Sequence, residues 1–397
     1  MKKYLWILVA LIYIALVFLV IRSTPSSATL LNDAQAFVDL SLNPFASKHF
    51  IDLGYPLVLY IFGLFVGPNN LIAMQILNYL LWVGATYFIA LSLKASRSVL
   101  TIPLTILMLF SPLFLTFSAK LYSEPLSAFG VALLVFGLSA SITWPLLLGA
   151  VIVVTTKSIF YPAIIILSLY LLATQLSRKG ITLMFLAVLL IPYFLGSLGG
   201  GRTLYNLAIE RAKLDLGYDQ IVACAPYYLS YPLGQQLLPK YEGVCRQNDV
   251  ISSLPGAIDN PYSRAGIYRA QGFSYLDWVK SISAEPLKYL LVFTVGLFNL
   301  VLFEGVYPSI LLQMSGVFVV ICYLLFKLIL NLYLWSKVFI VTKQSPILLL
   351  PFVYLFIMIG NFQVEPRYIY PLLPYIYYLA GRNTQSSSRA DKDSNHR

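Results

Sequence analysis

Residues 4–21 read YLWILVALIYIALVFLVI, a continuous apolar run with no charged side chain. An α-helix needs about 20 mainly apolar residues to cross the hydrocarbon core of a bilayer, so this run is long enough to span one. Lys2 and Lys3 precede it and place the N-terminus in the cytoplasm. A cleaved signal peptide would have a shorter apolar region, and residues 26–28 offer only a weak cleavage site. We therefore expect an uncleaved first span.

Apolar runs of this kind recur along the whole chain. They lie at 54–67, 69–93, 99–118, 125–140, 143–156, 158–176, 181–198, 285–303, 306–335, 345–362 and 366–381. The runs are continuous, whereas strands of an outer-membrane barrel alternate apolar and polar residues. Only 11% of the 397 residues are charged, against about 25% in a soluble domain. The composition excludes a soluble enzyme, a disordered protein and a nucleic-acid-binding protein, and it predicts an all-α polytopic membrane protein.

Lysine and arginine set the predicted orientation. They stand between apolar runs and in the tail, at Lys94, Arg97, Arg178, Lys179, Lys337, Lys343 and Arg382. Cytoplasmic placement of these residues satisfies the positive-inside tendency and leaves loops 22–53 and 199–284 outside. Between an outer loop and an inner lysine the chain must cross the membrane an odd number of times. To satisfy this, we interpret 54–67 and 285–303 as half-buried or re-entrant helices on the outer side. We expect about nine to eleven transmembrane or re-entrant helices in one domain, 1–381, followed by a disordered cytoplasmic tail, 382–397.

Two of the three cysteines fall in the large outer loop. Cys224 and Cys245 are 21 positions apart (245 − 224), and a disulfide there would restrain a loop with little core in an oxidising compartment. The alternative is two free thiols that never meet. Cys322 lies in an apolar run and is expected to be a small buried hydrophobe.

Asp33 and Asp39 occupy the first outer loop. On a helix their six-residue spacing turns the two carboxylates more than 100° apart, so they need not share one site. Asp33 could act as a general base at the membrane surface. The alternative is that Asn32 or Asp33 only caps a short interfacial helix.

Three Glu-Pro pairs open apolar runs, at Glu124, Glu285 and Glu365. Proline suits the first helical turn, and an acid there favours the positive end of the helix dipole, so each pair is a helix-start signal. Glu124 and Glu365 also lie at the outer membrane boundary beside basic residues, and Lys157 interrupts two runs on the same side. Charges at such a depth are costly and mark candidate functional sites.

This distribution suits a reaction between an anionic membrane lipid and a polar acceptor. A transporter would more often have broken helices and polar groups at the midplane. The middles of most runs are apolar, apart from Lys327, which can snorkel to the interface. His49 and His396 are the only histidines, so neither a metal-ligand cluster nor a Ser-His-Asp triad is expected.

Four short motifs resemble a known family. Residues 33–41 with 54–57, LYSEPL at 121–126, TTKS at 155–158 and EPRYIYPLLP at 365–374 are similar to segments of GT-C membrane glycosyltransferases. These include the protein O-mannosyltransferases and the lipid A aminoarabinose transferases. Lys157 departs from the Arg-Pro that usually stands in the third segment, and the outer loop with its two cysteines matches no subfamily.

The resemblance implies a GT-C-like bundle that takes a sugar from a polyprenyl-phosphate lipid donor. Asp33 would deprotonate the acceptor, which is a glycan, a lipid or a protein, and the sugar would transfer with inversion. Arg367 is the first choice to neutralise the leaving phosphate, and Glu124 would position bases or hold the donor sugar. The further candidates for substrate binding are Tyr368, Glu365, Lys157, Arg202, Arg269, Asp39 and His49. A divalent metal is left open but not required.

The implied location is a bacterial inner membrane, with the active site facing the periplasm or the cell exterior. Two other classes stay open. An O-antigen polymerase-like glycan-assembly protein would also have a large outer loop, with arginine pairs dominating its charges. A transporter or flippase would show central polar residues and pseudo-symmetric halves.

Overall fold

The computed structural model describes residues 2–24, 33–44, 53–157, 160–174, 317–344, 346–352 and 369–382, with seven isolated positions between 190 and 301. The described part is mostly helical and contains no strand. The chain divides into two compact units, one formed by 1–201, 333–352 and 370–397, the other by 202–332 and 353–369. Almost every element described below belongs to the first unit.

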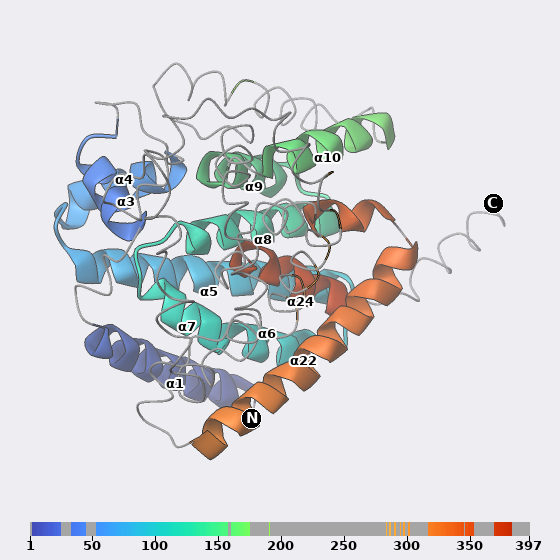
Figure 1. Ribbon diagram of the computed structural model, residues 1–397, viewed down its shortest axis with the longest axis horizontal. Coiled ribbons are helices and arrows are strands. Elements are labelled where there is room, and N and C mark those ends of the chain that lie inside the picture. Colours follow the sequence, from blue (N-terminus) through green and yellow to red (C-terminus); the bar gives the residue numbers. More distant parts are fainter. Residues whose placement is uncertain are drawn as a thin grey trace. The chain divides into compact units, whose positions relative to one another are not determined.

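Most of the described helices lie within the apolar runs, and Figure 1 shows their arrangement. They are α1 (Lys2–Ser23), α3 (Asp33–Leu42), α4 (Gly54–Val66), α5 (Leu71–Ala95), α6 (Thr101–Leu109), α7 (Pro112–Ser118), α8 (Glu124–Ala140), α9 (Thr143–Thr156), α10 (Tyr161–Thr174), α22 (Val317–Gln344) and α24 (Leu373–Gly381), with short 3₁₀ helices η3 (Pro346–Phe352) and η5 (Tyr370–Leu372). α3 and the end of α22 lie outside the apolar runs.

Three of the described helices are long and apolar enough to cross a membrane. The segments are Trp6–Ser23, Leu71–Ala95 and Leu325–Lys343. α4, α8 and α9 are apolar but shorter. These three helices agree with the helical membrane protein expected from the sequence. The expected number of nine to eleven spans stays a prediction.

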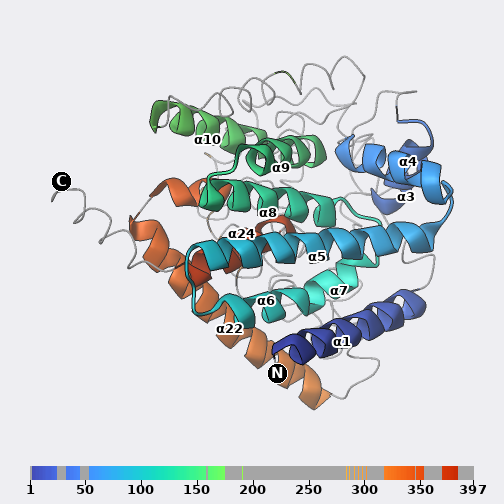
Figure 2. The ribbon, with the colours of Figure 1, turned by 180° about the vertical axis from the view of Figure 1, so that it is seen from behind.

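The centre of the first unit is a layer in which α8 packs between α5 and α9 (Figure 1). Only Ser141 and Ile142 connect α8 to α9, and Ser141 has a left-handed backbone with φ of 58°. Such a short connection makes the two helices antiparallel neighbours. α1 packs on α7 and α5, and α24 packs on α5, α6 and α8 (Figure 2).

The contact between α8 and α9 is close enough to require glycine. A Cβ added at Gly149 would lie 2.6 Å from the Gly130 carbonyl oxygen and 2.7 Å from the Leu134 nitrogen. Small residues let apolar helices approach through backbone contacts, which is how helices associate where no water is expelled.

The run 99–118 is not one helix, as a single span would be. α6 ends at Leu109 and α7 begins at Pro112, and between them Ser111 is extended, with ψ of 121°. Proline lacks the N–H of a helical hydrogen bond and drives the preceding residue out of the helical region, so Pro112 breaks the run.

Three sequence expectations for α22 are wrong. Lys337 and Lys343 lie inside the helix rather than in a loop before the next run, because α22 continues to Gln344. Lys327 is 2% exposed and does not snorkel. Cys322 is exposed, not buried; an apolar run shows that a segment avoids water, but not which side chains face neighbouring helices.

Candidate functional site

A buried ion pair joins α8 to the end of α9. Lys157 Nζ lies 3.0 Å from Glu124 Oε1, and the side chains are 18% and 1% exposed, respectively. Glu124 begins α8 just before Pro125, and Lys157 is the residue after α9. Because α8 and α9 are antiparallel, the start of one meets the end of the other, so a pair 33 residues apart forms from the packing itself.

The second oxygen of the Glu124 carboxylate has no hydrogen-bond partner among the described residues. Glu124 Oε2 and the neighbouring Ser123 Oγ are buried, and neither makes a hydrogen bond within the described part of the chain. Buried polar atoms normally have a partner, so these two atoms can accept a hydrogen bond from a bound molecule. In the same ranges no three His, Cys, Asp or Glu residues gather as a metal site would require.

A hydrogen-bonded chain lies beside the ion pair. The Tyr55 hydroxyl donates to Asn78 Oδ1 at 2.9 Å, and Asn78 Nδ2 donates to the Lys120 carbonyl at 2.9 Å. Gln75 Nε2 donates to the Ala119 carbonyl at 2.6 Å. These bonds hold the turn before Ser123 against α4 and α5, which fixes where α8 and Glu124 begin.

The start of α4 approaches the end of α9 just as closely. A Cβ at Gly54 would lie 2.7 Å from the backbone of Thr155, so only glycine fits there. One residue later, the Tyr55 ring packs edge-on against Phe37 of α3, with 5.3 Å between the ring centroids. α3 and the start of α4 are thereby joined to the residues that precede Lys157.

The start of the C-terminal helical segment reaches the same turn. The Tyr370 hydroxyl is 2.9 Å from Ser118 Oγ, and its ring packs against Trp82 and Phe114. All of these side chains are buried. Tyr370 therefore brings η5 against the turn that precedes Glu124.

The two predicted aspartates lie on α3. Asp33 begins this helix, in the turn where the dipole favours a carboxylate, which is compatible with both interpretations made from the sequence. Asp39 is exposed and accepts a hydrogen bond from Gln35 Nε2 at 2.7 Å, one turn away on the same helix. No described contact links Asp39 to the Glu124–Lys157 pair.

The other candidates lie outside the described residues. They are His49, Arg202, Arg269, Glu365, Arg367 and Tyr368, together with Cys224 and Cys245 of the proposed disulfide. Of the predicted site residues, the structure therefore brings Glu124 and Lys157 together and leaves Asp39 apart.

The network around Tyr55, Asn78 and Tyr370 was missed by the sequence interpretation. A signal for it exists in the run 69–93. Gln75, Asn78, Tyr79 and Trp82 recur at helical spacing, and all four are buried. Amides on one face of an apolar helix need polar partners, so this face could have been identified as buried against polar groups of another segment, although the sequence does not say which segment.

Comparison with known proteins adds no assignment, because no family model, no curated protein and no solved structure matches this chain.

Proposed function

We propose that the chain is a GT-C-type membrane glycosyltransferase, which transfers a sugar from a polyprenyl-phosphate donor to an acceptor at the outer face. The observation that carries this proposal is the meeting of four distant motif segments at one end of the first unit. They contribute Gly54 and Tyr55, Glu124, Thr155 and Lys157, and Tyr370. Glu124 and Lys157 meet because α8 and α9 are antiparallel, and α4 and η5 bring the other two segments to the same end.

The proposed step is an inverting displacement. Asp33 takes the proton of the acceptor hydroxyl while the acceptor oxygen bonds to the anomeric carbon. The bond from that carbon to the phosphate oxygen breaks, and the lipid phosphate leaves with the electron pair. A preorganised cation is most useful where this charge develops.

Lys157 suits the role of that cation. Its side chain is partly exposed, whereas Glu124 is buried and holds the ammonium through Oε1 alone. Glu124 Oε2 would accept a hydrogen bond from a hydroxyl of the donor sugar. Arg367, with Arg202 and Arg269 as alternatives, would add positive charge, and Glu365 and Tyr368 would contact the substrate. The same proposal places the chain in a bacterial inner membrane, with this end outside.

One observation favours a second candidate, a transporter or flippase for a lipid-linked sugar. Lys327 and Asn331 are buried at 2% and 1% exposure in the middle of α22. They are four residues apart and share one helix face. Buried polar residues within a span are typical of a transport pathway.

The test uses the purified full-length chain in proteoliposomes with polyprenyl-monophosphate-linked sugars and a membrane extract as acceptor. Release of polyprenyl phosphate is measured. Asp33→Asn keeps the shape of the side chain but removes the base, and loss of a general base lowers the rate about 10²–10⁴-fold. Asp39→Asn is the matched comparison and should lose much less, because its carboxylate is exposed and bound to Gln35.

Equal rates for Asp33→Asn and the wild type would reject the catalytic role and leave only helix capping. Movement of the intact lipid-linked sugar between leaflets, with no polyprenyl phosphate released, would favour the second candidate instead.

A further inference from the structure

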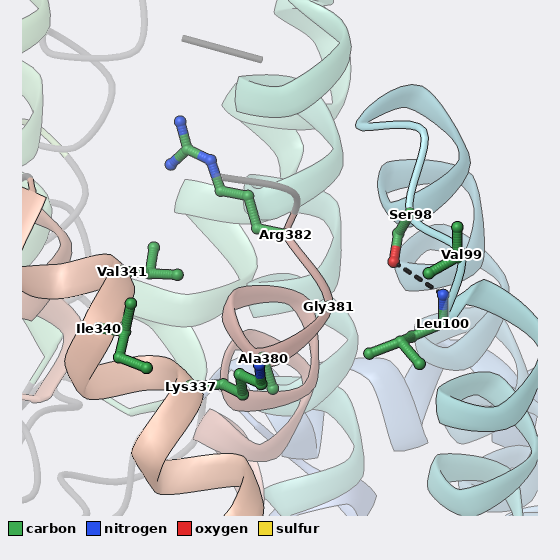
Figure 3. A pocket seen from close by; sticks show the side chains of 9 residues that line it. All are labelled: Ser98, Val99, Leu100, Lys337, Ile340, Val341, Ala380, Gly381 and Arg382. Carbon is green, nitrogen blue, oxygen red and sulfur yellow. Dashed lines mark hydrogen bonds between the residues drawn. The ribbon is translucent and has the colours of Figure 1, made fainter. Parts of the chain in front are cut away.

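A second site lies at the end of the first unit remote from the ion pair. It is a pocket of about 200 Å³ with three walls. The first wall is Ser98–Leu100, after α5. The second is Lys337, Ile340 and Val341 of α22, and the third is Ala380 and Gly381 at the end of α24 with Arg382 after it (Figure 3).

The distance between this pocket and the ion pair can be followed along α5. Asn78 bonds to the turn before Glu124, and Leu93 lies 15 residues further on (93 − 78), about 22 Å along a helix that rises 1.5 Å per residue. At that position a Cβ on Gly381 would lie 2.5 Å from Leu93 Cδ2. The pocket is therefore separate from the Glu124–Lys157 site.

The charge of the pocket is positive. Lys337 and Arg382 line it, and Lys94 and Arg97 are exposed on the adjoining end of α5 and the turn after it. Among the described residues the only acids are Asp33, Asp39 and Glu124, which belong to α3 and the start of α8. The Lys337 ammonium lies over the Tyr333 ring, 5.7 Å from its centroid, so it does not need a carboxylate to stay in place.

A hydroxyl and apolar side chains complete the lining. Ser98 Oγ accepts a hydrogen bond from the Leu100 N–H at 3.2 Å, which leaves the Ser98 O–H to donate (Figure 3). Val99 is 92% exposed and Ile340 is 49% exposed beside the cations. A soluble anion would gain nothing from these apolar surfaces, whereas a lipid presents a phosphate and hydrocarbon together.

We propose that this pocket binds the phosphate of an anionic phospholipid from the leaflet at that end of the bundle. Lys337 and Arg382 hold the phosphate oxygens, Ser98 donates a hydrogen bond, and the glycerol and upper acyl chains rest on Val99 and Ile340. Basic pockets between membrane helices bind lipid headgroups in this way. The proposal stands whether or not the chain transfers sugar.

The experiment measures lipid binding to the purified full-length protein in detergent micelles, by native mass spectrometry and by the shift in thermal unfolding temperature. The probes are phosphatidylglycerol, phosphatidylcholine and inorganic phosphate. A cation near an anionic lipid contributes about 1 kcal/mol, or about fivefold in affinity, so K337Q with R382Q should weaken phosphatidylglycerol binding about 25-fold. K343Q is the matched control, because Lys343 is exposed on α22 but does not line the pocket.

Selective binding of phosphatidylglycerol over phosphatidylcholine, lost in the double variant and kept in K343Q, is the expected result. Inorganic phosphate that stabilises the wild type as strongly as phosphatidylglycerol would overturn the lipid assignment. Equal binding of the two lipids would do so as well. If the double variant does not fold, salt titration of the wild type decides: phosphatidylglycerol binding that is unchanged between low and high salt rejects the site.

Discussion

At the residue scale, the central feature is the Glu124 carboxylate, which is 1% exposed and, among the described residues, pairs with one cation, Lys157. Removing a charge from water is costly, and attraction to a partner offsets that cost only while the partner is present. Lys157 is less buried than Glu124, so it can reach solvent if released. The pair is therefore asymmetric, and its two halves should respond differently to substitution.

Lys157→Met should destabilise the protein strongly, because it leaves the Glu124 carboxylate buried and unpaired. Breaking a buried pair in this way costs about 3–5 kcal/mol. Glu124→Gln should cost less, and the double variant should be close to Glu124→Gln alone. The free energy of unfolding in mixed detergent micelles measures all three. A double variant as unstable as Lys157→Met would show that the pair does not interact as the structure indicates.

At the element scale, apolar runs predicted the positions of most helices, because a membrane span needs a long uninterrupted apolar segment. Helix starts were also readable, since Glu124-Pro125 opens α8 as expected. What the runs could not give was which face of a helix is buried. Lys327 and Cys322 show this on α22, where the lysine is buried and the cysteine is exposed.

The candidate site could likewise be predicted in part: its residues could be identified from the sequence, but not their contacts. Glu124 and Lys157 could be singled out as boundary charges, because such charges are rare in a chain with 11% charged residues. Their partnership could not be predicted, since it arises from the antiparallel packing of α8 and α9. The Tyr55–Asn78 bond likewise depends on a contact between two helices.

The α8–α9 contact can be tested through Gly149. Gly149→Leu would place side-chain atoms where the backbone of α8 lies, and overpacking of this kind costs about 1–3 kcal/mol or more. Because the two helices also position Glu124 and Lys157, activity in the polyprenyl-phosphate assay should fall together with stability. Leu148→Ala, one residue away on a side chain 43% exposed, should change stability by less than about 0.5 kcal/mol. If Gly149→Leu were as stable as Leu148→Ala, the close contact would be rejected.

At the scale of the whole molecule, the two ends of the first unit carry different charges. Lys337 and Arg382 line the pocket at one end, beside Lys94 and Arg97, and no acid lies there among the described residues, whereas Glu124 lies at the other end with Lys157 and Lys120. Positive charge is retained on the cytoplasmic side of membrane proteins. The ion pair, and with it the proposed chemistry, should then face outward.

Cysteine labelling tests this orientation in a background without native cysteines. With Ser253→Cys, a membrane-impermeant maleimide should label spheroplasts directly, because loop 199–284 is predicted outside. With Ser388→Cys, labelling should appear only after permeabilisation, because the tail is predicted inside. Both positions are serine in the native chain, so the two variants differ in location alone. The opposite pattern would put Glu124 and Lys157 on the cytoplasmic side. Transfer from an outward-facing polyprenyl-phosphate donor would then be excluded, whatever the geometry of the ion pair.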